Sequence, residues 1–321
     1  MRRRKSRIVM DIIVTGGYGF IGSHLCNYLT KKGCNVHNID SLTYACDYVN
    51  SQDVEVYKDY TVDITNNQKL DSIVHNKRFD AIIHLAAESH VDNSISNPNI
   101  FASTNVIGTI NMLNLAKKYR IPRYIQVSTD EVYGSLNENE PSWTENTPLQ
   151  PNSPYSASKA SGDLIAYSYF KTFNMDIRIT RCCNNFGTGQ HIEKLIPKSI
   201  TTATKYGFID IYGDGNNVRE WIHAEDHSRA IFKVLQYGEP GNIYNIGSGE
   251  ELTNNEIASI ISVVTGTDAS INYIEDRKGH DKRYSLNFDK ISKLGFKCRR
   301  SIRDSKEWDE MVQYYKKYQD S

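Results

Sequence analysis

The 321-residue sequence predicts an α/β fold, in which a doubly wound parallel sheet is followed by a smaller C-terminal lobe. Three observations predict this fold. Short β-branched or apolar runs alternate with longer segments of helical period through the first half of the chain. A glycine-rich turn follows the first of these runs. After about residue 181 the elements become shorter and are interrupted by Gly, Asn and charged residues.

The alternating half of the chain supplies the elements of the sheet. Each expected helix is long enough to make the crossover that two parallel neighbouring strands require. The expected strands lie at 9–15, 35–39, 57–62, 80–85, 123–128 and 176–181, and the expected helices between them at 20–32, 66–76, 97–119 and 155–173.

The remainder of the chain forms the expected second lobe. Its helices are predicted at 194–205, 224–237, 253–266 and 302–318. We therefore divide the chain into a domain at 1–181 and a lobe at 182–321, with an approximate boundary that the chain is free to cross. Because no Pro-rich or Gly/Ser-rich linker separates the two, we expect one shared interface with a ligand cleft between them.

Composition and charge exclude several functional classes. Lys plus Arg and Asp plus Glu both number 38, so no overall field favours nucleic acid or an anionic surface. No apolar run approaches the roughly 18 residues of a membrane span, so a soluble protein is expected. The six cysteines show no metal-ligand spacing, which predicts no metal site and a reducing, cytoplasmic setting. The basic residues at 2–7 are expected to form a solvated tail.

The first expected strand runs into a turn whose chemistry suits a pyrophosphate. Glycines let the backbone approach the ligand closely, and its charge then lies on the free N–H groups of the following helix. Asp40 ends the second strand, where an acid bonds a ribose 2′-hydroxyl and repels a 2′-phosphate. The pattern predicts bound NAD in preference to NADP, and the less favoured alternative is a structural turn with Asp40 as a cap. The residues of the turn and the helix start are Gly16, Gly19, Phe20, Ile21 and Gly22.

Two further strand ends are expected to touch the cofactor. Asp63 and Ile64 follow the third strand, where an adenine edge would lie, and Leu85, Ala86 and Ala87 follow the fourth. The small alanine side chains permit close approach of a ligand to the backbone. A structural interpretation, in which the alanines pack beneath a helix, is equally compatible with the spacing.

A tyrosine and a lysine on one helix face form the candidate base. Tyr155 and Lys159 are four residues apart, so their side chains emerge on the same face of the expected helix. A cation beside a phenol stabilises the phenolate and lowers its pKa from about 10 toward neutrality. This spacing alone is common by chance, and it gains weight from the glycine turn earlier in the chain.

Two adjacent carboxylates follow the fifth strand. Asp130 and Glu131 come directly after Thr129, at the sheet edge where doubly wound folds bind ligands. In a cleft, such a pair can divide into a general acid and a general base if the surroundings separate the two pKa values. The alternative, a pair of solvated surface charges, is about as well supported by the sequence.

Over nearly its whole length the sequence resembles the nucleotide-diphosphate-glucose 4,6-dehydratases of the dTDP-glucose type, within the extended short-chain dehydrogenase/reductase superfamily. Asp130 discriminates within that superfamily, because related decarboxylases usually carry Ser there and 4-epimerases lack the acidic pair. The resemblance implies a Rossmann domain that binds NAD and a lobe that binds the nucleotide sugar. The matching segments are the glycine turn, 84–92, 128–134, 155–159, 184–185, 193–197, 217–221 and 276–281.

The resemblance also implies a lyase mechanism with NAD as a recycled cofactor. Tyr155, helped by Lys159, would take the proton of the sugar 4-hydroxyl while hydride leaves C4, and Thr129 would hydrogen-bond the oxygen that becomes the ketone. Glu131 would then take the C5 proton as Asp130 protonates the departing 6-hydroxyl, and the hydride would return at C6. The implied product is an NDP-4-keto-6-deoxyglucose, on the way to rhamnose-type deoxysugars.

Further residues are assigned to the nucleotide sugar by the resemblance alone. Arg219 and Arg277 are expected at the diphosphate because a guanidinium fork suits phosphate oxygens. The remaining assigned residues are Ser89, Asn184, Lys194 and His280. Departures from the family pattern at 182, 183, 188 and 278 leave the choice between a uracil and a thymine nucleotide open.

Two expected helices, 97–119 and 155–173, are apolar around more of their circumference than one sheet face would cover. Because relatives pair through these helices, a homodimer is implied. Neither nucleic acid nor a membrane is expected as a partner. Two other functions stay open: an NDP-sugar 4-epimerase, which needs Tyr155 and NAD but not the acidic pair, and a non-catalytic NAD-binding protein.

Overall fold

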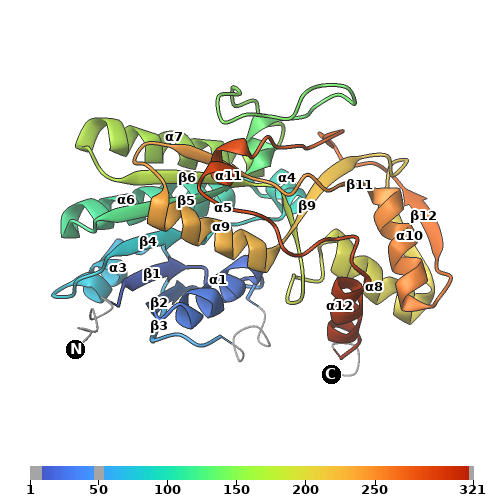
Figure 1. Cartoon of the computed structure of the whole chain (residues 1–321), viewed down its shortest axis with the longest axis horizontal. Helices are drawn as coiled ribbons and strands as arrows, with labels where there is room; N and C mark the ends of the chain where they lie inside the picture. Colours follow the sequence, from blue (N-terminus) through green and yellow to red (C-terminus); the bar gives the residue numbers. More distant parts are fainter. Residues whose placement is uncertain (1–8, 47–53, 318–321) are drawn as a thin grey trace, which may run out of the picture.

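Five strands from the first half of the chain pair with two later strands in a seven-stranded sheet (Figure 1). The computed structural model describes residues 9–46 and 54–317, so the basic segment at 2–7 lies outside the described residues. Every strand pair in this sheet is parallel. The strand order is β10-β6-β5-β4-β1-β2-β3, with β1 (Asp11–Thr15), β2 (Asn35–Asp40), β3 (Lys58–Thr61), β4 (Ala81–His84), β5 (Arg123–Thr129), β6 (Ile177–Cys182) and β10 (Ile243–Ile246).

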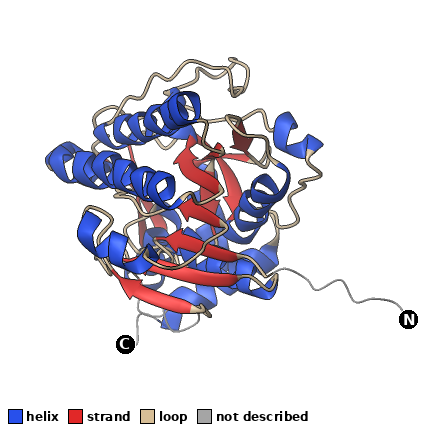
Figure 2. Ribbon diagram, turned by 90° about the vertical axis from the view of Figure 1, so that its left-hand side faces the viewer, coloured by secondary structure: helices blue, strands red, loops and turns tan. Residues whose placement is uncertain are grey.

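Helices cover both faces of this sheet (Figure 2). One face carries α1 (Phe20–Lys31) and α9 (Ala224–Tyr237), and the other carries α3 (Asn67–Val74), α6 (Gly108–Tyr119) and α7 (Pro154–Phe173). Ile12 and Val14 pack into the first apolar core, and Ile13 between them packs into the second, with no exposed surface on any of the three. The predicted doubly wound fold is confirmed. The chain order reverses between β1 and β4, which places a ligand crevice at their carboxyl ends.

The segment expected as one helix at 97–119 is divided into three parts. They are α5 (Pro98–Phe101), a π-helical turn (Ala102–Ile107) and α6, and a further helix that the sequence did not predict, α4 (Val91–Ser96), precedes them. Within the π-helical turn, the Asn105 amide accepts from the Glu88 backbone N at 2.8 Å and donates to the Ser158 hydroxyl at 2.8 Å. Such turns are frequent at functional sites, and here Asn105 ties the β4 loop to α7.

The second lobe has its own apolar core around Phe186, Trp221 and Trp308. A three-stranded sheet is formed by β7 (Asn184–Phe186), β9 (Val218–His223) and β11 (Glu251–Thr253), and a parallel pair by β8 (Phe208–Tyr212) and β12 (Ser270–Ile274). The lobe helices are α8 (Leu195–Tyr206), α10 (Asn254–Thr265) and α12 (Ser305–Lys317), close to the predicted ranges. Two short helices, Asp130–Tyr133 and α11 (Asp289–Lys293), were not predicted.

The chain crosses between the two parts more than once. Although they follow the predicted boundary, α9 and β10 return to the layers of the large sheet. The division at 181 therefore does not separate two compact units of the chain. That residues 1–181 bind the cofactor and residues 182–321 bind the substrate stays a prediction. Among the helices that the structure describes, none is long and apolar enough to cross a bilayer.

Candidate active site

A cavity of about 460 Å³ opens at the carboxyl edge of the large sheet, with walls from both lobes. Every residue that the sequence assigned to the cofactor or to the reaction lines it, and so do Ser89, Asn184 and Lys194. The tertiary structure thus brings together side chains from positions 16 to 194. Arg219, Arg277 and His280 are not among the lining residues.

The glycine turn forms one side of this cavity, and its backbone segments pack closely against one another. Gly16 has a φ of 74°, in the left-handed region that favours glycine. A Cβ on Gly22 would lie 1.9 Å from the Gly16 carbonyl oxygen, so position 22 accepts no side chain without a shift of the turn. Gly19 precedes the first residue of α1, whose first N–H groups face the turn without a side-chain cap. The arrangement is that of a backbone anion site.

The carboxyl ends of β1 and β4 are held together beside the turn. The Thr15 hydroxyl accepts from the backbone N–H groups of Leu85 and Ala86, both at 3.1 Å. A Cβ on Gly16 would come within 2.9 Å of the Ala86 Cα. This close approach requires glycine at position 16, whether or not a ligand also uses it.

Asp40 lies at the end of β2 and accepts from two backbone N–H groups, those of Tyr18 at 3.0 Å and Leu42 at 2.9 Å. Burial raises the pKa of Asp40, and these two hydrogen bonds oppose the rise. Each carboxylate oxygen keeps a further lone pair that could accept a ribose hydroxyl. Asp63 is exposed and accepts from Thr65, whereas Ile64 is buried.

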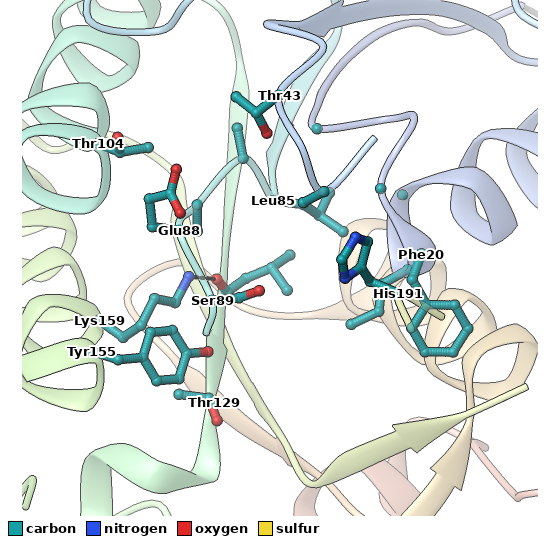
Figure 3. Close-up of a pocket in the computed structure, with 18 of the residues that line it drawn as sticks. Phe20, Thr43, Leu85, Glu88, Ser89, Thr104, Thr129, Tyr155, Lys159 and His191 are labelled. Atoms are coloured by element: carbon teal, nitrogen blue, oxygen red, sulfur yellow. Dashed lines mark hydrogen bonds between the residues drawn. The ribbon is translucent and has the colours of Figure 1, made fainter. Parts of the chain in front are cut away.

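Tyr155 and Lys159 point from α7 into the cavity, toward Thr129 and Ser89 (Figure 3). The first turn of α7 is fixed by Pro154 at its start and a capping box. Lys159 Nζ donates to the Val127 carbonyl at 2.7 Å, and burial lowers the pKa of Lys159 to about 8.

The pKa of Tyr155 is shifted in the direction opposite to the one predicted from the sequence. Burial raises it, Glu131 and Asp130 raise it further, and a hydrogen bond with Thr129 opposes them. The spacing rule considered only the cation, whereas the fold also places the phenol out of water and beside two acids. The predicted role of Tyr155 as a base therefore depends on positive charge supplied when the site is loaded.

The two adjacent acids have different surroundings. Asp130 is 1% exposed, and its Oδ2 is buried with no hydrogen-bond partner among the described residues. Burial raises the pKa of Asp130 well above its usual value, and the charges of Glu131 and Cys182 add to the rise. These surroundings favour a protonated Asp130, and its burial excludes the solvated-charge alternative.

Glu131 faces cations instead. Burial also raises its pKa, but Arg277, Arg219 and Lys194 all oppose the rise. The pKa of both acids is raised, but only Glu131 has three cations that oppose the rise, so the surroundings favour the protonated form more strongly at Asp130 than at Glu131. This separation is what a general acid and a general base require.

The residues assigned to the nucleotide sugar are only partly gathered at the cavity. Lys194 Nζ donates to the Ser89 carbonyl at 2.9 Å, and Asn184 begins β7. The Arg219 guanidinium is buried, donates to the Asp281 carbonyl at 2.9 Å and lies 4.1 Å from the centre of the Tyr284 ring.

Arg277 and His280 each lie beside an acid. Arg277 Nη1 is 3.8 Å from the Asp92 carboxylate, and His280 Nδ1 is 2.6 Å from Asp276. Arg219 and Arg277 act on Glu131 through their charge while pointing at other protein groups. Their contact with a diphosphate stays a prediction.

Several residues that line the cavity were not assigned by the sequence analysis, among them Glu193, His191 and His227. Glu193 lies 3.6 Å from His191 Nδ1, and His227 Nδ1 is 3.0 Å from the Asn185 side-chain oxygen. Glu193 belongs to the matched segment 193–197, which was a usable signal. The two histidines have no spacing that points to the cavity, because the loop after β7 and helix α9 reach it only in the folded chain.

Comparisons with known proteins extend over nearly the whole chain. A family model described as GDP-mannose 4,6 dehydratase matches residues 13–307. The low-salt glycan biosynthesis protein Agl12 of Haloferax volcanii is 44% identical over 317 residues, 95% of this chain and 98% of that protein. A dTDP-glucose 4,6-dehydratase of Streptomyces griseus is 44% identical over 291 residues, 89% of this chain and 88% of that protein.

The same likeness holds in three dimensions. The crystal structure of DesIV, a dTDP-glucose 4,6-dehydratase from Streptomyces venezuelae with NAD bound, matches this chain with a TM-score of 0.91 and 44% identity. The match covers 97% of this chain and 98% of DesIV.

Proposed function

The chain belongs to the GDP-mannose 4,6 dehydratase family, and from this premise we propose that it is a lyase acting on a nucleotide-diphosphate glucose. The resemblance to 4,6-dehydratases stated from the sequence is confirmed. The proposed products are the NDP-4-keto-6-deoxyglucose and water, a step toward deoxysugars of the rhamnose type. The observation that carries the proposal is the divided acidic pair, because elimination of water needs a buried acid beside a base.

The residues on one side of the cavity fit NAD. The turn at 16–22 is a cradle that a Cβ would fill, α1 offers its uncapped N–H groups, and Asp40 keeps lone pairs for a ribose. When bound, NAD supplies the acceptor and donor of the hydride that moves from C4 to C6, and its ring cation lowers the pKa of the nearby phenol. Asp40 disfavours the 2′-phosphate of NADP.

The chain's own groups then perform the proton steps. Tyr155 takes the proton of the 4-hydroxyl, with Lys159 and Thr129 beside it. Oxidation at C4 acidifies C5, and Glu131 takes that proton while Asp130 protonates the departing 6-hydroxyl. Asp130 is suited to this step because burial raises its pKa well above the usual value and so favours its protonated form.

Arg219, Arg277, Lys194, Asn184, Ser89 and His280 are proposed to hold the nucleotide sugar. The two arginines would have to turn from the carbonyl of Asp281 and the carboxylate of Asp92 toward the diphosphate. The nucleotide is proposed to be dTDP or UDP, and the identity with dTDP-glucose 4,6-dehydratases makes dTDP-glucose the first substrate to test.

A cytoplasmic homodimer is proposed as the working form. Exposed apolar side chains gather on the α5 to α7 side of the molecule, where Ile107 is 49% and Leu164 62% exposed. Ile100 and Tyr167 extend this apolar face. A second copy of the chain would cover it, as a helix face that packs against helices requires.

The direct test is incubation of the protein with dTDP-glucose and with UDP-glucose in parallel. The expected result is a sugar nucleotide lighter by one water, and turnover in heavy water should place one deuterium at C5. An epimerase would give a C4 epimer of unchanged mass, and a non-catalytic protein would bind NAD without product. Either outcome contradicts the proposed lyase.

A further inference from the structure

The catalytic face of α7 carries a third ionisable residue. Asp163 follows Lys159 by four residues, as Lys159 follows Tyr155, so the three side chains lie along one stripe of the helix. Asp163 is 2% exposed and does not line the cavity. The mechanism above gives it no role, although a buried carboxylate is costly unless it is paired.

One side of Asp163 is paired with Arg181 on β6. Arg181 Nε donates to Asp163 Oδ2 at 2.9 Å, and both side chains are almost fully buried. The Arg181 guanidinium lies 4.8 Å from the centre of the Tyr133 ring, and the Tyr133 hydroxyl donates to Asn245. Burial raises the pKa of Asp163, and the Arg181 cation is the largest of the groups that oppose this rise.

The charge of Asp163 also acts on the catalytic lysine. Asp163 Oδ1 is buried without a hydrogen bond of good geometry among the described residues. Lys159 and Ser128 are the groups that stabilise its charge besides Arg181. One carboxylate oxygen of Asp163 is thus bound to Arg181, the other has no hydrogen bond among the described residues, and Lys159 lies one helical turn earlier on the same face of α7.

Lys159 needs such a partner. Its Nζ donates to the uncharged Val127 carbonyl, and burial lowers the pKa of Lys159 to about 8. Asp163 is the neighbour that opposes this fall. From β4, His84 faces Lys159 as a neutral ring, because burial and the charge of Lys159 lower the pKa of His84 to about 3. Tyr155 is the remaining titratable neighbour on α7 itself.

We propose that Asp163 is a positioning residue that keeps Lys159 protonated at neutral pH, and that Arg181 acts through Asp163. The effect of Asp163 on the titration of Lys159 does not depend on the proposed lyase function. The effect of Asp163 on turnover rests on that function. Loss of the negative charge makes the lysine ammonium less favourable, so Lys159 releases its proton at lower pH. The alkaline limb of the activity profile then moves to lower pH as well.

The test is the titration of Lys159 in the protein without substrate, followed by NMR of lysine labelled with carbon-13 at Cε. The resonance is assigned by its absence in Lys159→Arg. In Asp163→Asn the Lys159 midpoint is expected to fall by about 1 to 3 pH units, and Asp163→Glu should restore most of the shift. An unchanged midpoint in folded Asp163→Asn overturns the proposal.

Two further variants separate this effect from damage to the fold. Asp176→Asn breaks the neighbouring ion pair with Arg178 on β6, which does not face Lys159, and should leave the midpoint in place. If Asp163→Asn unfolds, the double variant Asp163→Leu with Arg181→Met removes both charges together, which buried pairs often tolerate. Its Lys159 midpoint is expected to fall by less than in Asp163→Asn, because the neighbouring Arg181 cation is lost as well, and a midpoint like that of the unmodified protein overturns the proposal.

Turnover gives a separate readout. With dTDP-glucose or UDP-glucose, the alkaline limb of the kcat–pH profile is expected to move to lower pH in Asp163→Asn, with little change in KM. If the unmodified protein turns over neither substrate, the proposed lyase fails. The titration of Lys159 still decides the role of Asp163 in that case.

Discussion

The two halves of the cavity are built from different materials. The half beside α1 consists mainly of backbone. Gly16, Gly22 and Ala86 have small or no side chains and leave room for a ligand, and hydrogen bonds from N–H groups fix the strand ends. The half beside α7 consists of buried ionisable groups, of which Asp130 and Lys159 have strongly shifted pKa values. The half beside α1 offers space and backbone N–H groups for a ligand, and the half beside α7 offers ionisable groups for proton transfer.

This difference predicts two kinds of failure. An added methyl in the backbone half should block binding while leaving the acids as they are. A neutral isostere in the charged half should leave binding intact and remove one proton step. Each experiment below tests whether the two halves can be damaged separately.

The largest effect is expected from Tyr155→Phe, which removes the proposed base and keeps the ring. Product formation should fall about 10³-fold, within the usual range for general base catalysis. Mass spectrometry of the sugar nucleotide measures the rate of product formation. The amount of NAD that copurifies shows whether the backbone half still binds the cofactor. Loss of NAD together with activity would show that the two halves are not separable.

Asp130→Asn separates two steps within the charged half, the elimination of water and the oxidation at C4. The proposed acid disappears while Tyr155 and Lys159 remain, so dehydration should fall about 10²-fold and oxidation at C4 should persist. Stopped-flow absorbance of the reduced nicotinamide at 340 nm follows the oxidation, and the loss of water follows the elimination. Equal losses in both steps would contradict the assignment of Asp130 as the acid.

Gly22→Ala addresses the backbone half. Its Cβ would meet the Gly16 carbonyl oxygen, and overpacking of this kind costs about 1 to 3 kcal/mol, which is about 5- to 140-fold in affinity for NAD if the cost falls on the bound form. Isothermal titration with NAD measures the effect. Gly207→Ala is the control, because its φ of 73° strains the backbone far from the turn. It should lower the melting temperature and leave NAD affinity unchanged.

The raised pKa of Asp130 also predicts a stability effect. Between the unfolded and the folded pKa, the native state holds a proton that the unfolded chain has released, so the free energy of unfolding falls as pH rises. Asn carries no such proton. Asp130→Asn should therefore be more stable than the unmodified protein at pH 7, by about 1 kcal/mol or more, and the gain should vanish below about pH 4. Urea unfolding at both pH values tests the sign.

The smallest catalytic effect is expected outside the cavity. Leu164→Glu places a charge on the exposed apolar face of α7 and should halve the molar mass in light scattering, with little change in kcat. Val263→Glu, at a more exposed position on α10, is the control and should stay dimeric. A mass equal to one chain in the unmodified protein contradicts the proposed homodimer.

Much of the backbone half could be predicted from the sequence because its signals are local. A glycine spacing, a strand and a following acid occupy one stretch of chain, and the predicted strands differ from β1 to β6 by only one or two residues at each end. The charged half was predicted less completely. The sequence identified Tyr155 and Asp130, but the direction of the Tyr155 pKa shift was wrong and Asp163 was not noticed.

The short elements of the second lobe escaped prediction for a related reason. Strands such as β7 and β11 have only three residues each, too few for a period to be recognised. The π-helical turn was missed because its residues have an ordinary helical pattern. Its geometry depends on Asn105, whose partners Glu88 and Ser158 lie on other elements.

By itself, the sequence determined which groups are available and in what order: an alternating sheet, a glycine turn, an acid pair and a Tyr–Lys face, since these follow from contacts within a few residues. The tertiary structure alone decided their protonation states. A pKa depends on how much water is excluded and on which charges approach from other elements. Arg181, Arg219 and Arg277 reach the catalytic groups only when the chain has folded.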